Sequence, residues 1–579
     1  MGGVSENSMI CRKEHPKPQF QRNDWMNLNG QWFFEIDHGN SGIARGLYEG
    51  TAAFSQTIHV PFCPESSLSG IGYTDFMNSV WYKRSVTLTK EQIKGRTVLH
   101  FGAVDYFTTV YVNGVACGTH QGGYVSFCFD ITQFVREGEN TITVNARDDS
   151  RDPLIPSGKQ SFKYASECCH YTRTTGIWQT VWLEFTPKNY IKNVKYYPDI
   201  EGGTVTIHAD LVGEGTFTAN AFFEGEAVGA AACHCRGGQT VMTIKLEEVH
   251  LWEVGKGNLY DLILKYGEDT VSSYFGLRSI QYTDYKFLLN GKSVFQRLVL
   301  DQGFYPDGIY TAPSDEALAA DIDRGMAMGF NGARLHEKIF EERFLYHCDK
   351  KGYLVWGEYP DWGLDLSRPD AIYGIIPEWI EAINRDFNHP SIVGWCPLNE
   401  VWDRDHKAPL KELVSTVYQV TKATDPTRPC IDASGGFHVQ TDIYDLHDYQ
   451  QNPEIFRSYF ENFEKDFSVT TPGAFHDRQT YDKKVPFFIS EYGGMAWDNS
   501  GNGWGYGDAP KTAEEFIDRL QKLTDVLMDN KKMFGFCYTQ LYDIEQEQNG
   551  LYTYNREPKF PPEKISPIFS RTAAIEDTV

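Results

Sequence analysis

Short runs in which apolar and polar residues alternate fill the first part of the chain, and turn-forming pairs such as Asn113-Gly114 and Gly122-Gly123 separate them. Examples are "VWYKRSVTL", "FTTVYVNGVACG" and "NTITVNARD". Many short strands at this spacing predict a β-sandwich or jelly roll over residues 1–187. The same pattern continues at a smaller scale over residues 188–278, where it predicts an immunoglobulin-like β-sandwich.

From residue 279 onward, apolar strand-like runs alternate with amphipathic helical runs. The expected strands are "VFQRLVLDQG", "NGARLHE", "YLVWGEYP", "IVGWCPLNE", "RPCIDASG", "DIYDLHDY", "PFFISEYGG" and "MFGFCYTQLYD". The clearest helices are expected at residues 314–328, with Ser314 as N-cap, and at 341–351, 379–387, 410–423 and 512–529. Eight strands interleaved with helices predict a (β/α)8 TIM barrel over residues 279–579, although the pattern shows no convincing helix between Gly435 and Asp442. The whole chain is therefore predicted to be a multidomain β and α/β protein.

The composition narrows the classes of partner. A formal net charge of −24 argues against a nucleic-acid partner, since affinity for phosphates depends on clusters of Lys and Arg that the sequence does not contain. No run approaches the roughly 18 apolar residues of a membrane span, and the first residues show no apolar core of a secretory signal. The twelve cysteines are scattered, which suits free thiols in a cytoplasmic protein. Cys233 and Cys235 have no second cluster with zinc-site spacing, so we expect an ordinary strand there and neither metal nor cofactor.

Polar residues gather at the ends of the expected barrel strands, where the active sites of TIM barrels lie. They are Asp301, Arg334, His336, Glu358, Asn399, Glu400, Asp432, His447, Tyr449, Glu491, Tyr538 and Asp543. Glu400 ends the fourth strand and Glu491 the seventh, so the two carboxylates are expected to face each other across the barrel mouth. Removing a carboxylate from water at the end of a buried strand costs free energy unless the group is paired or protonated. We therefore favour a functional pair over two unrelated strand-end salt bridges.

Two facing carboxylates can divide acid and base work when their surroundings favour different protonation states. We expect Glu400, flanked by Trp395 and Trp402, to be the protonated acid. Glu491, within reach of Arg334, is expected to be the charged nucleophile. A separation of about 5 Å would favour double displacement through a covalent intermediate, whereas a wider gap would admit a water for inversion. The sequence leaves that separation open.

Several segments resemble glycoside hydrolase family 2, the family of β-galactosidases, β-glucuronidases and β-mannosidases. The segments "LNEVWD" and "FFISEYGG" are similar to its acid/base and nucleophile segments. "WMNLNGQWFFEID" and "RTTGIWQTVWLE" are similar to the start and end of its sugar-binding jelly roll, and "NGLYTYNREPK" to its closing segment. The resemblance covers nearly the whole chain. It implies a hydrolase of small glycosides or oligosaccharides and a homo-oligomer, either a dimer or a tetramer.

The resemblance also implies a role for each matching residue. Glu400 would be the acid/base, Glu491 the nucleophile, and Asn399 a ligand of the sugar 2-hydroxyl. Arg334 would keep the nucleophile ionised. The sugar site would be lined by His336, Glu358, His447, Tyr449 and Tyr538, the last in place of a Trp that relatives use as a sugar platform. The first sandwich would close the pocket near residues 171–173, which favours exo action.

Glucuronidases of this family carry an Asn-x-Lys motif whose lysine binds the uronate. The matching stretch here is Glu547-Gln548-Asn549, which has an acid and no lysine. However, alternation in "ARLHEKIF" would point Arg334, His336 and Lys338 the same way if the strand extends that far, and such a cluster could clamp a carboxylate.

We therefore expect an exo-acting, retaining β-glycosidase for galacto-configured sugars, either β-galactosides or β-galacturonides. One alternative is a β-glucuronidase. Another is an inactive carbohydrate-binding protein on the same scaffold, and a third is a metal-dependent hydrolase that uses Glu358.

Overall fold

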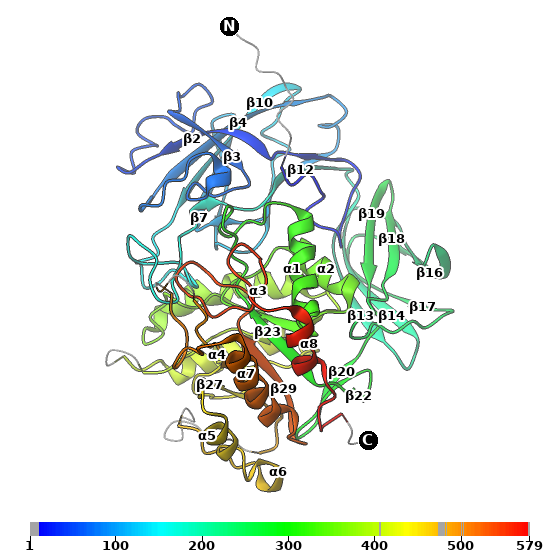
Figure 1. Cartoon of the computed structure of the whole chain (residues 1–579). Coiled ribbons are helices and arrows are strands. Elements are labelled where there is room, and N and C mark those ends of the chain that lie inside the picture. The colour runs from blue at the N-terminus through cyan, green and yellow to red at the C-terminus, as the bar shows by residue number, and fades with distance from the viewer. Residues whose placement is uncertain are drawn as a thin grey trace.

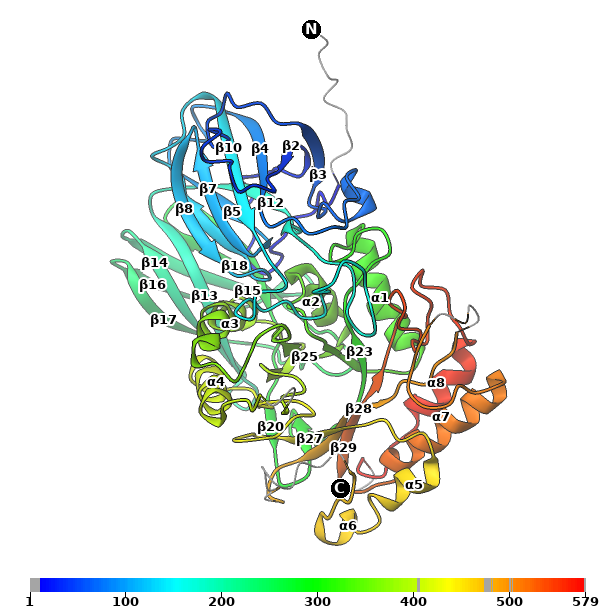
Figure 2. The same ribbon diagram turned by 90° about the vertical axis from the view of Figure 1, so that its left-hand side faces the viewer.

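The computed structural model describes residues 11–403, 407–472, 481, 483–498, 501 and 503–576. Figure 1 shows a β-sandwich near the N-terminus, a second and smaller sandwich beside it, and a barrel of strands and helices in the C-terminal half. In the view of Figure 2, the first sandwich lies over one side of the barrel. This architecture confirms the predicted fold class.

The first sandwich consists of antiparallel sheets. One has the order β3 (Gln56–Val60), β2 (Gly30–Ile36), β4 (Val80–Leu88), β10 (Gly138–Arg147), β7 (Phe107–Val112) and β8 (Val115–Gln121). The other has the order β1 (Trp25–Asn27), β12 (Val181–Thr186), β5 (Arg96–Phe101) and β9 (Phe127–Asp130), while β6 (Val104–Asp105) pairs with β11 (Gly176–Ile177). In β7, Thr108, Val110 and Val112 are buried and the residues between them are partly exposed, as period-two alternation requires.

The second sandwich has two smaller sheets. One contains β13 (Tyr190–Asp199), β14 (Thr204–Val212) and β17 (Gly238–Lys245), and the other β16 (Glu226–Cys235), β15 (Gly215–Phe223), β18 (Tyr260–Tyr266) and β19 (Asp269–Phe275). Ile207, Phe217 and Leu262 belong to the apolar core between them. A short sheet of β20 (Ile280–Tyr282), β21 (Phe287–Leu289) and β22 (Lys292–Ser293) then leads into the barrel.

Within the part of the chain that the structure describes, seven parallel strands form the barrel sheet. Their order is β26 (Ile392–Cys396), β25 (Leu354–Glu358), β24 (Gly332–Leu335), β23 (Gln296–Asp301), β29 (Met533–Thr539), β28 (Phe487–Gly493) and β27 (Tyr444–Asp448). The predicted fifth strand is present only as isolated bridges, in which Cys430 pairs with Trp395 and Ser434 with Asn399. The chain turns there because the Asp432 carboxylate accepts backbone N–H groups from residues 433, 439 and 440. Residues 430–434 thus form a seam between β26 and β27.

Helices cover the outside of the barrel. Five lie where the sequence predicts them: α1 (Asp315–Ala327), α2 (Glu342–Lys351), α3 (Ile372–Asp386), α4 (Lys411–Thr424) and α7 (Ala513–Met528). Three others were not predicted: α5 (Pro453–Ser458), α6 (Phe463–Asp466) and α8 (Pro562–Ser570). Ser314 caps α1 as expected, since its side chain accepts the Ala317 N–H.

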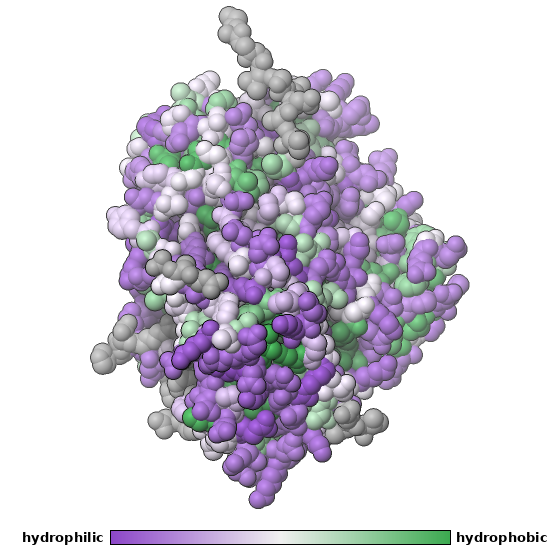
Figure 3. Space-filling model, in the orientation of Figure 1, coloured by the Kyte–Doolittle hydropathy of each residue, from purple (hydrophilic) through white to green (hydrophobic). Residues whose placement is uncertain are grey.

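The surface is largely polar. The face in Figure 3 is mostly hydrophilic, in keeping with the formal net charge of −24. Among the helices of the described residues, none combines the length and apolarity needed to cross a membrane.

Candidate active site

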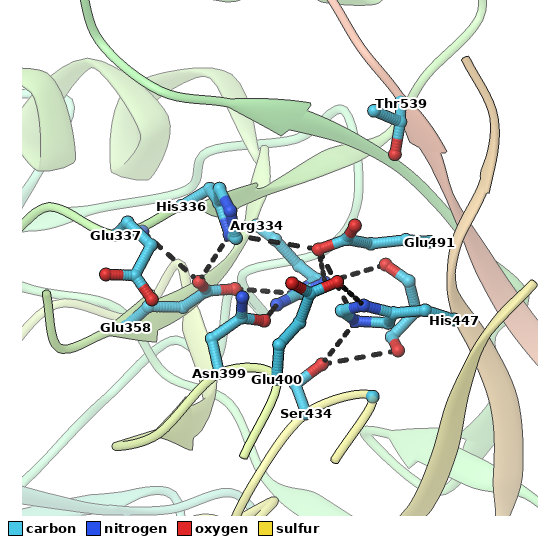
Figure 4. A network of polar contacts seen from close by, with 12 residues as sticks. Arg334, His336, Glu337, Glu358, Asn399, Glu400, Ser434, His447, Glu491 and Thr539 are labelled. Atoms are coloured by element: carbon cyan, nitrogen blue, oxygen red, sulfur yellow. Dashed lines mark hydrogen bonds and ion pairs between the residues drawn. The ribbon is translucent and has the colours of Figure 1, made fainter. Parts of the chain in front are cut away.

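Polar side chains from several barrel strands converge at their carboxyl ends (Figure 4). Glu400 follows β26, His447 lies in β27 and Glu491 lies in β28. One carboxylate oxygen of Glu400, one of Glu491 and a ring nitrogen of His447 all lie within 4.8 Å of one another. The fold therefore brings together the two acids that the sequence analysis paired.

Arg334, on β24, is the buried cation of this cluster. Its Nη1 lies 3.2 Å from Glu491 Oε1, and its Nε lies 2.6 Å from Glu358 Oε1. Its Nη2 donates to Asn399 Oδ1 at 3.3 Å. A buried guanidinium must be compensated by opposite charge, and such pairing favours the ionised form of a carboxylate. This geometry suits a charged Glu491.

Glu400 has an unusual backbone conformation that aims its side chain. Its φ of 52° lies in the left-handed region, which is uncommon for residues other than glycine. Its N–H donates to Ser434 O at 2.7 Å, and the Asn399 N–H donates to Asp361 Oδ1 at 2.7 Å. These bonds offset a strain on the order of 1–3 kcal/mol. Figure 4 shows the resulting orientation, with the Glu400 carboxylate directed at His447.

His447 contacts both acids. Its Nδ1 lies 3.0 Å from Glu400 Oε1, and its Nε2 lies 3.4 Å from Glu491 Oε1. Burial alone would lower the pKa of His447, but the charges of Glu491 and Glu400 outweigh that effect and raise it above its usual value. Ser434 Oγ lies 3.1 Å from Nε2 and donates to Asp445 Oδ2 at 2.6 Å, which fixes the ring.

Tyr449 is the second hydrogen-bond partner of Glu491. Its hydroxyl donates to Glu491 Oε2 and lies 3.2 Å from Thr539 Oγ1. Burial and the Glu491 charge raise the pKa of Tyr449 well above its usual value, so the phenol stays a donor. Its ring stacks on Tyr506, with centroids 3.5 Å apart. The stacking fixes the direction from which the hydroxyl approaches Glu491.

Asn399 and His336 lie beside the two acids. The Asn399 Nδ2 is buried and has no hydrogen-bond acceptor among the described residues. A buried donor without a partner costs about 1–3 kcal/mol, which indicates a donor kept for a ligand. His336 Nδ1 lies 3.0 Å from Glu358 Oε2. Burial and the charge of Lys159 lower the pKa of His336 well below its usual value, so its ring is neutral.

Lys338 does not join this cluster. The strand β24 ends at Leu335, and Glu337 has a φ of 51°, so the alternation that was expected to align Lys338 with Arg334 is broken. The Lys338 ammonium donates instead to Gly303 O at 2.6 Å and Tyr310 O at 2.9 Å.

Tyr538 also lies outside the cluster. It is fully buried and packs against the rings of Tyr492, Phe569 and Phe330, on the helix-covered side of the barrel. Because neighbouring side chains of a strand point to opposite faces, Thr539 rather than Tyr538 reaches Tyr449. The expected sugar platform at Tyr538 is therefore not present at the barrel mouth.

The first sandwich completes the site, as expected near residues 171–173. Tyr171 Oη donates to Glu547 Oε2 at 2.5 Å, and the Lys159 ammonium lies 3.6 Å from the centroid of the Trp362 ring. Arg173 donates to Ser161 O at 3.2 Å and so holds the loop together. Residues of the sandwich and the barrel thus meet beside the carboxylates.

A cleft of about 600 Å³ lies between this loop and the barrel. Glu400 and Asn399 line it, together with four aromatic rings from Phe162, His170, Trp362 and Trp402. Since Glu400 forms part of its wall, a molecule in the cleft would contact Glu400 directly.

Several residues near the carboxylates were missed by sequence reasoning: Lys159, Glu337, Ser434, Tyr506 and Thr539. Glu547 was noted only as an acid in place of a motif residue, and its contact with Tyr171 was not predicted. Strand alternation could have identified Thr539. Lys159, Tyr506 and Glu547 come from loops, whose sequences carry no period that indicates where they dock.

Glu400, His447 and Glu491 are also a group of described residues whose ligand atoms are close enough to hold a metal ion. However, His447 already pairs with Glu400, and Arg334 places a positive charge 3.2 Å from Glu491. A cation would be repelled by that guanidinium. The arrangement suits proton transfer and nucleophilic attack better than cation binding.

Family models of one glycosyl hydrolase family match three consecutive parts of the chain. The family model described as "Glycosyl hydrolases family 2, sugar binding domain" matches residues 25–187, "Glycosyl hydrolases family 2" matches residues 189–278, and "Glycosyl hydrolases family 2, TIM barrel domain" matches residues 280–563. A β-glucuronidase of Rattus norvegicus is 24% identical over 634 residues, covering 96% of this chain and 91% of that protein. A longer relative from Formosa agariphila is 25% identical over 511 residues, which are 84% of this chain but 59% of that relative. A solved β-glucuronidase from Ruminococcus gnavus in complex with D-glucuronic acid has a similar fold, with a TM-score of 0.77, 19% identity, and coverage of 96% of this chain and 100% of that one.

Proposed function

Because the chain belongs to glycosyl hydrolase family 2, we propose that it is an exo-acting, retaining β-glycosidase that removes terminal β-linked glucuronic acid from small glycosides. The observation that carries the proposal is the approach of the Glu400 and Glu491 carboxylates to within 4.8 Å. Retaining glycosidases have their carboxyl groups about 5–5.5 Å apart, whereas inverting enzymes leave about 6.5–9.5 Å for a water.

Glu491 is the nucleophile of the proposed reaction. Its carboxylate attacks the anomeric carbon as the bond to the leaving oxygen breaks, which forms a glycosyl-enzyme ester. Arg334 and Tyr449 support this role, because an ion pair and a phenol donor keep Glu491 charged and oriented before attack. Water then hydrolyses the ester and releases the sugar with its original configuration.

Glu400 is the acid and then the base. It protonates the leaving oxygen in the first step and takes a proton from the attacking water in the second. The part of the cleft beside Glu400 is therefore assigned to the leaving group, and the part beside Asn399 to the sugar. Asn399, with its unpaired Nδ2, is suited to donate to the sugar 2-hydroxyl.

The choice of glucuronic acid replaces the galacto-configured sugar expected from the sequence. The relatives named above as β-glucuronidases support it, and the comparisons give no support to a β-galactosidase or β-galacturonidase. The carboxylate clamp expected at Lys338, which had favoured galacturonides over galactosides, does not form, because the Lys338 ammonium is bound to two carbonyls away from the carboxylates. The homo-oligomeric state and the cytoplasmic location stay predictions.

A panel of p-nitrophenyl β-D-glycosides tests the proposal. We expect the highest kcat/KM on the glucuronide, compared with the galacturonide, glucoside and galactoside. Proton NMR during turnover should show the β-anomer of the sugar first. Preference for another sugar would contradict the substrate assignment, and initial release of the α-anomer would contradict the retaining mechanism.

A further inference from the structure

Lys159 lies in the loop "PSGKQSF", through which the first sandwich reaches the barrel. The loop fits tightly against the barrel at Gly158, where a Cβ atom would lie 2.5 Å from Glu337 O. Gly158 also has a φ of +53°, a conformation that side chains other than glycine rarely adopt. Close packing at Gly158 therefore fixes the position of the backbone next to Lys159.

The Lys159 side chain is mostly buried, and its ammonium faces an aromatic ring. The residue is 6% exposed, yet its ammonium forms no hydrogen bond or ion pair with any described residue. Two buried cations of the barrel differ: Lys338 donates to two carbonyls, and Arg334 pairs with Glu358 and Glu491. An ammonium has three donors, and burying them unpaired is costly. A ligand group at this position would offset that cost.

The surroundings of Lys159 place it at the sugar site. Its ammonium lies over Trp362, whose Nε1 donates to Asn399 O at 3.3 Å. Its backbone carbonyl accepts the N–H of Tyr171, which binds Glu547. Burial would lower the pKa of Lys159, but the neighbouring groups Cys169, Glu400, Glu547 and Glu337 outweigh that effect and raise the pKa. Lys159 is therefore a protonated cation beside the acid Glu400.

We propose that the Lys159 ammonium binds the carboxylate of the uronic acid ring, so that the first sandwich supplies the residue that selects charged over neutral sugars. The inference rests on the proposed function and names the recognition group of the same site. An ammonium with three rotatable donors, and with no polar partner among the described residues, is suited to bind a carboxylate oxygen. Residues 547–549 of the barrel contain no cation that could bind this carboxylate.

The test compares Lys159→Met with the parent on p-nitrophenyl β-D-glucuronide and β-D-glucoside. We expect kcat/KM on the glucuronide to fall about 30-fold or more, the effect of removing one partner of a buried charge pair. The fall in kcat/KM on the glucoside should be at least about tenfold smaller than the fall on the glucuronide, since no charge pair with the substrate is lost. The matched control is Lys163→Met, directly after the loop, because Lys163 is exposed and its ion pair is with Glu167 at the surface. This substitution should change neither rate.

Binding measurements separate this inference from the proposed function. In Glu491→Gln protein, D-glucuronate and D-glucose are titrated calorimetrically with Lys159 present and with Lys159→Met added. If Lys159→Met loses binding of glucuronate but keeps binding of glucose, the inference is supported, even if the parent protein does not cleave glucuronides. Equal losses for both sugars, or no loss for glucuronate in a variant with parental melting temperature, would overturn it.

Discussion

His447 connects the two candidate catalytic carboxylates, so at the level of single residues the site acts as one electrostatic unit. Its two ring nitrogens lie 3.0 Å from Glu400 Oε1 and 3.4 Å from Glu491 Oε1. Arg334 and Tyr449 contact only the Glu491 side of the pair. Substitutions at Glu400 and Tyr449 should therefore affect different steps of the reaction.

Substitution of Glu400 by Ala should reveal its part in leaving-group departure. General acid catalysis raises the reaction rate roughly 10²–10⁴-fold, and activated aryl leaving groups depart with little such assistance. We expect kcat/KM to fall by about that factor for alkyl glycosides and by much less for 2,4-dinitrophenyl glycosides, as measured by initial rates. Equal losses on both kinds of substrate would contradict the acid role.

Substitution of Tyr449 by Phe removes the phenol donor of Glu491 while keeping the ring that stacks on Tyr506. A hydrogen bond to a charged group is worth about 1.5–3 kcal/mol, so kcat/KM should fall roughly 10- to 100-fold on every substrate, whatever its leaving group. Steady-state rates on a leaving-group series check this. A loss confined to poor leaving groups would assign Tyr449 to the acid instead.

At the scale of elements, the sequence could predict features that depend on nearby residues. Helix α1 was placed correctly because its cap Ser314, its first-turn acids and its apolar period all lie within one segment. The ends of β24 and the seam at residues 430–434 could not be placed, because backbone contacts from distant segments decide them. The error at Lys338 followed directly from extending β24 too far.

The same distinction applies to the site. Glu400 and Glu491 could be paired in advance, because barrel topology alone brings the ends of the fourth and seventh strands together. Lys159 and Glu547 could not, because they meet through loops of different domains. The left-handed backbone of Glu400 was equally hidden, since nothing in "LNEVWD" signals a positive φ.

Helix α1 offers a test at this scale. Ser314→Ala removes the side-chain acceptor of the Ala317 N–H, which should cost about 1 kcal/mol of local stability. Amide hydrogen exchange in the first turn of α1 should then accelerate about fivefold. Ser314→Asp is the control, because it keeps an acceptor at the cap and should leave exchange nearly unchanged. Acceleration in both variants would argue against the cap.

At the scale of the whole molecule, buried polar contacts join the sandwich to the barrel. Glu378 of α3 accepts the Tyr124 N–H of the first sandwich at 2.7 Å, and its other oxygen lies 3.1 Å from Tyr359 Oη. Burial raises the pKa of Glu378 to about 7. The folded protein therefore keeps a proton that the unfolded chain releases above about pH 4.5, so this group lowers stability as the pH rises from there to 7.

Substitution of Glu378 by Gln should remove that pH dependence. Its amide oxygen can still accept the Tyr124 N–H, and its amide nitrogen can donate to Tyr359 Oη. We expect the variant to melt at a higher temperature than the parent at pH 8 and at nearly the same temperature at pH 4.5, by calorimetry. A variant that is less stable at pH 8 would show that the interface depends on the ionised carboxylate.

Tyr171 meets Glu547 and Lys159 meets Trp362, so residues of two domains lie together beside the carboxylates. Substitutions in the sandwich loop can therefore change the wall beside Glu400 and Glu491 without replacing either glutamate.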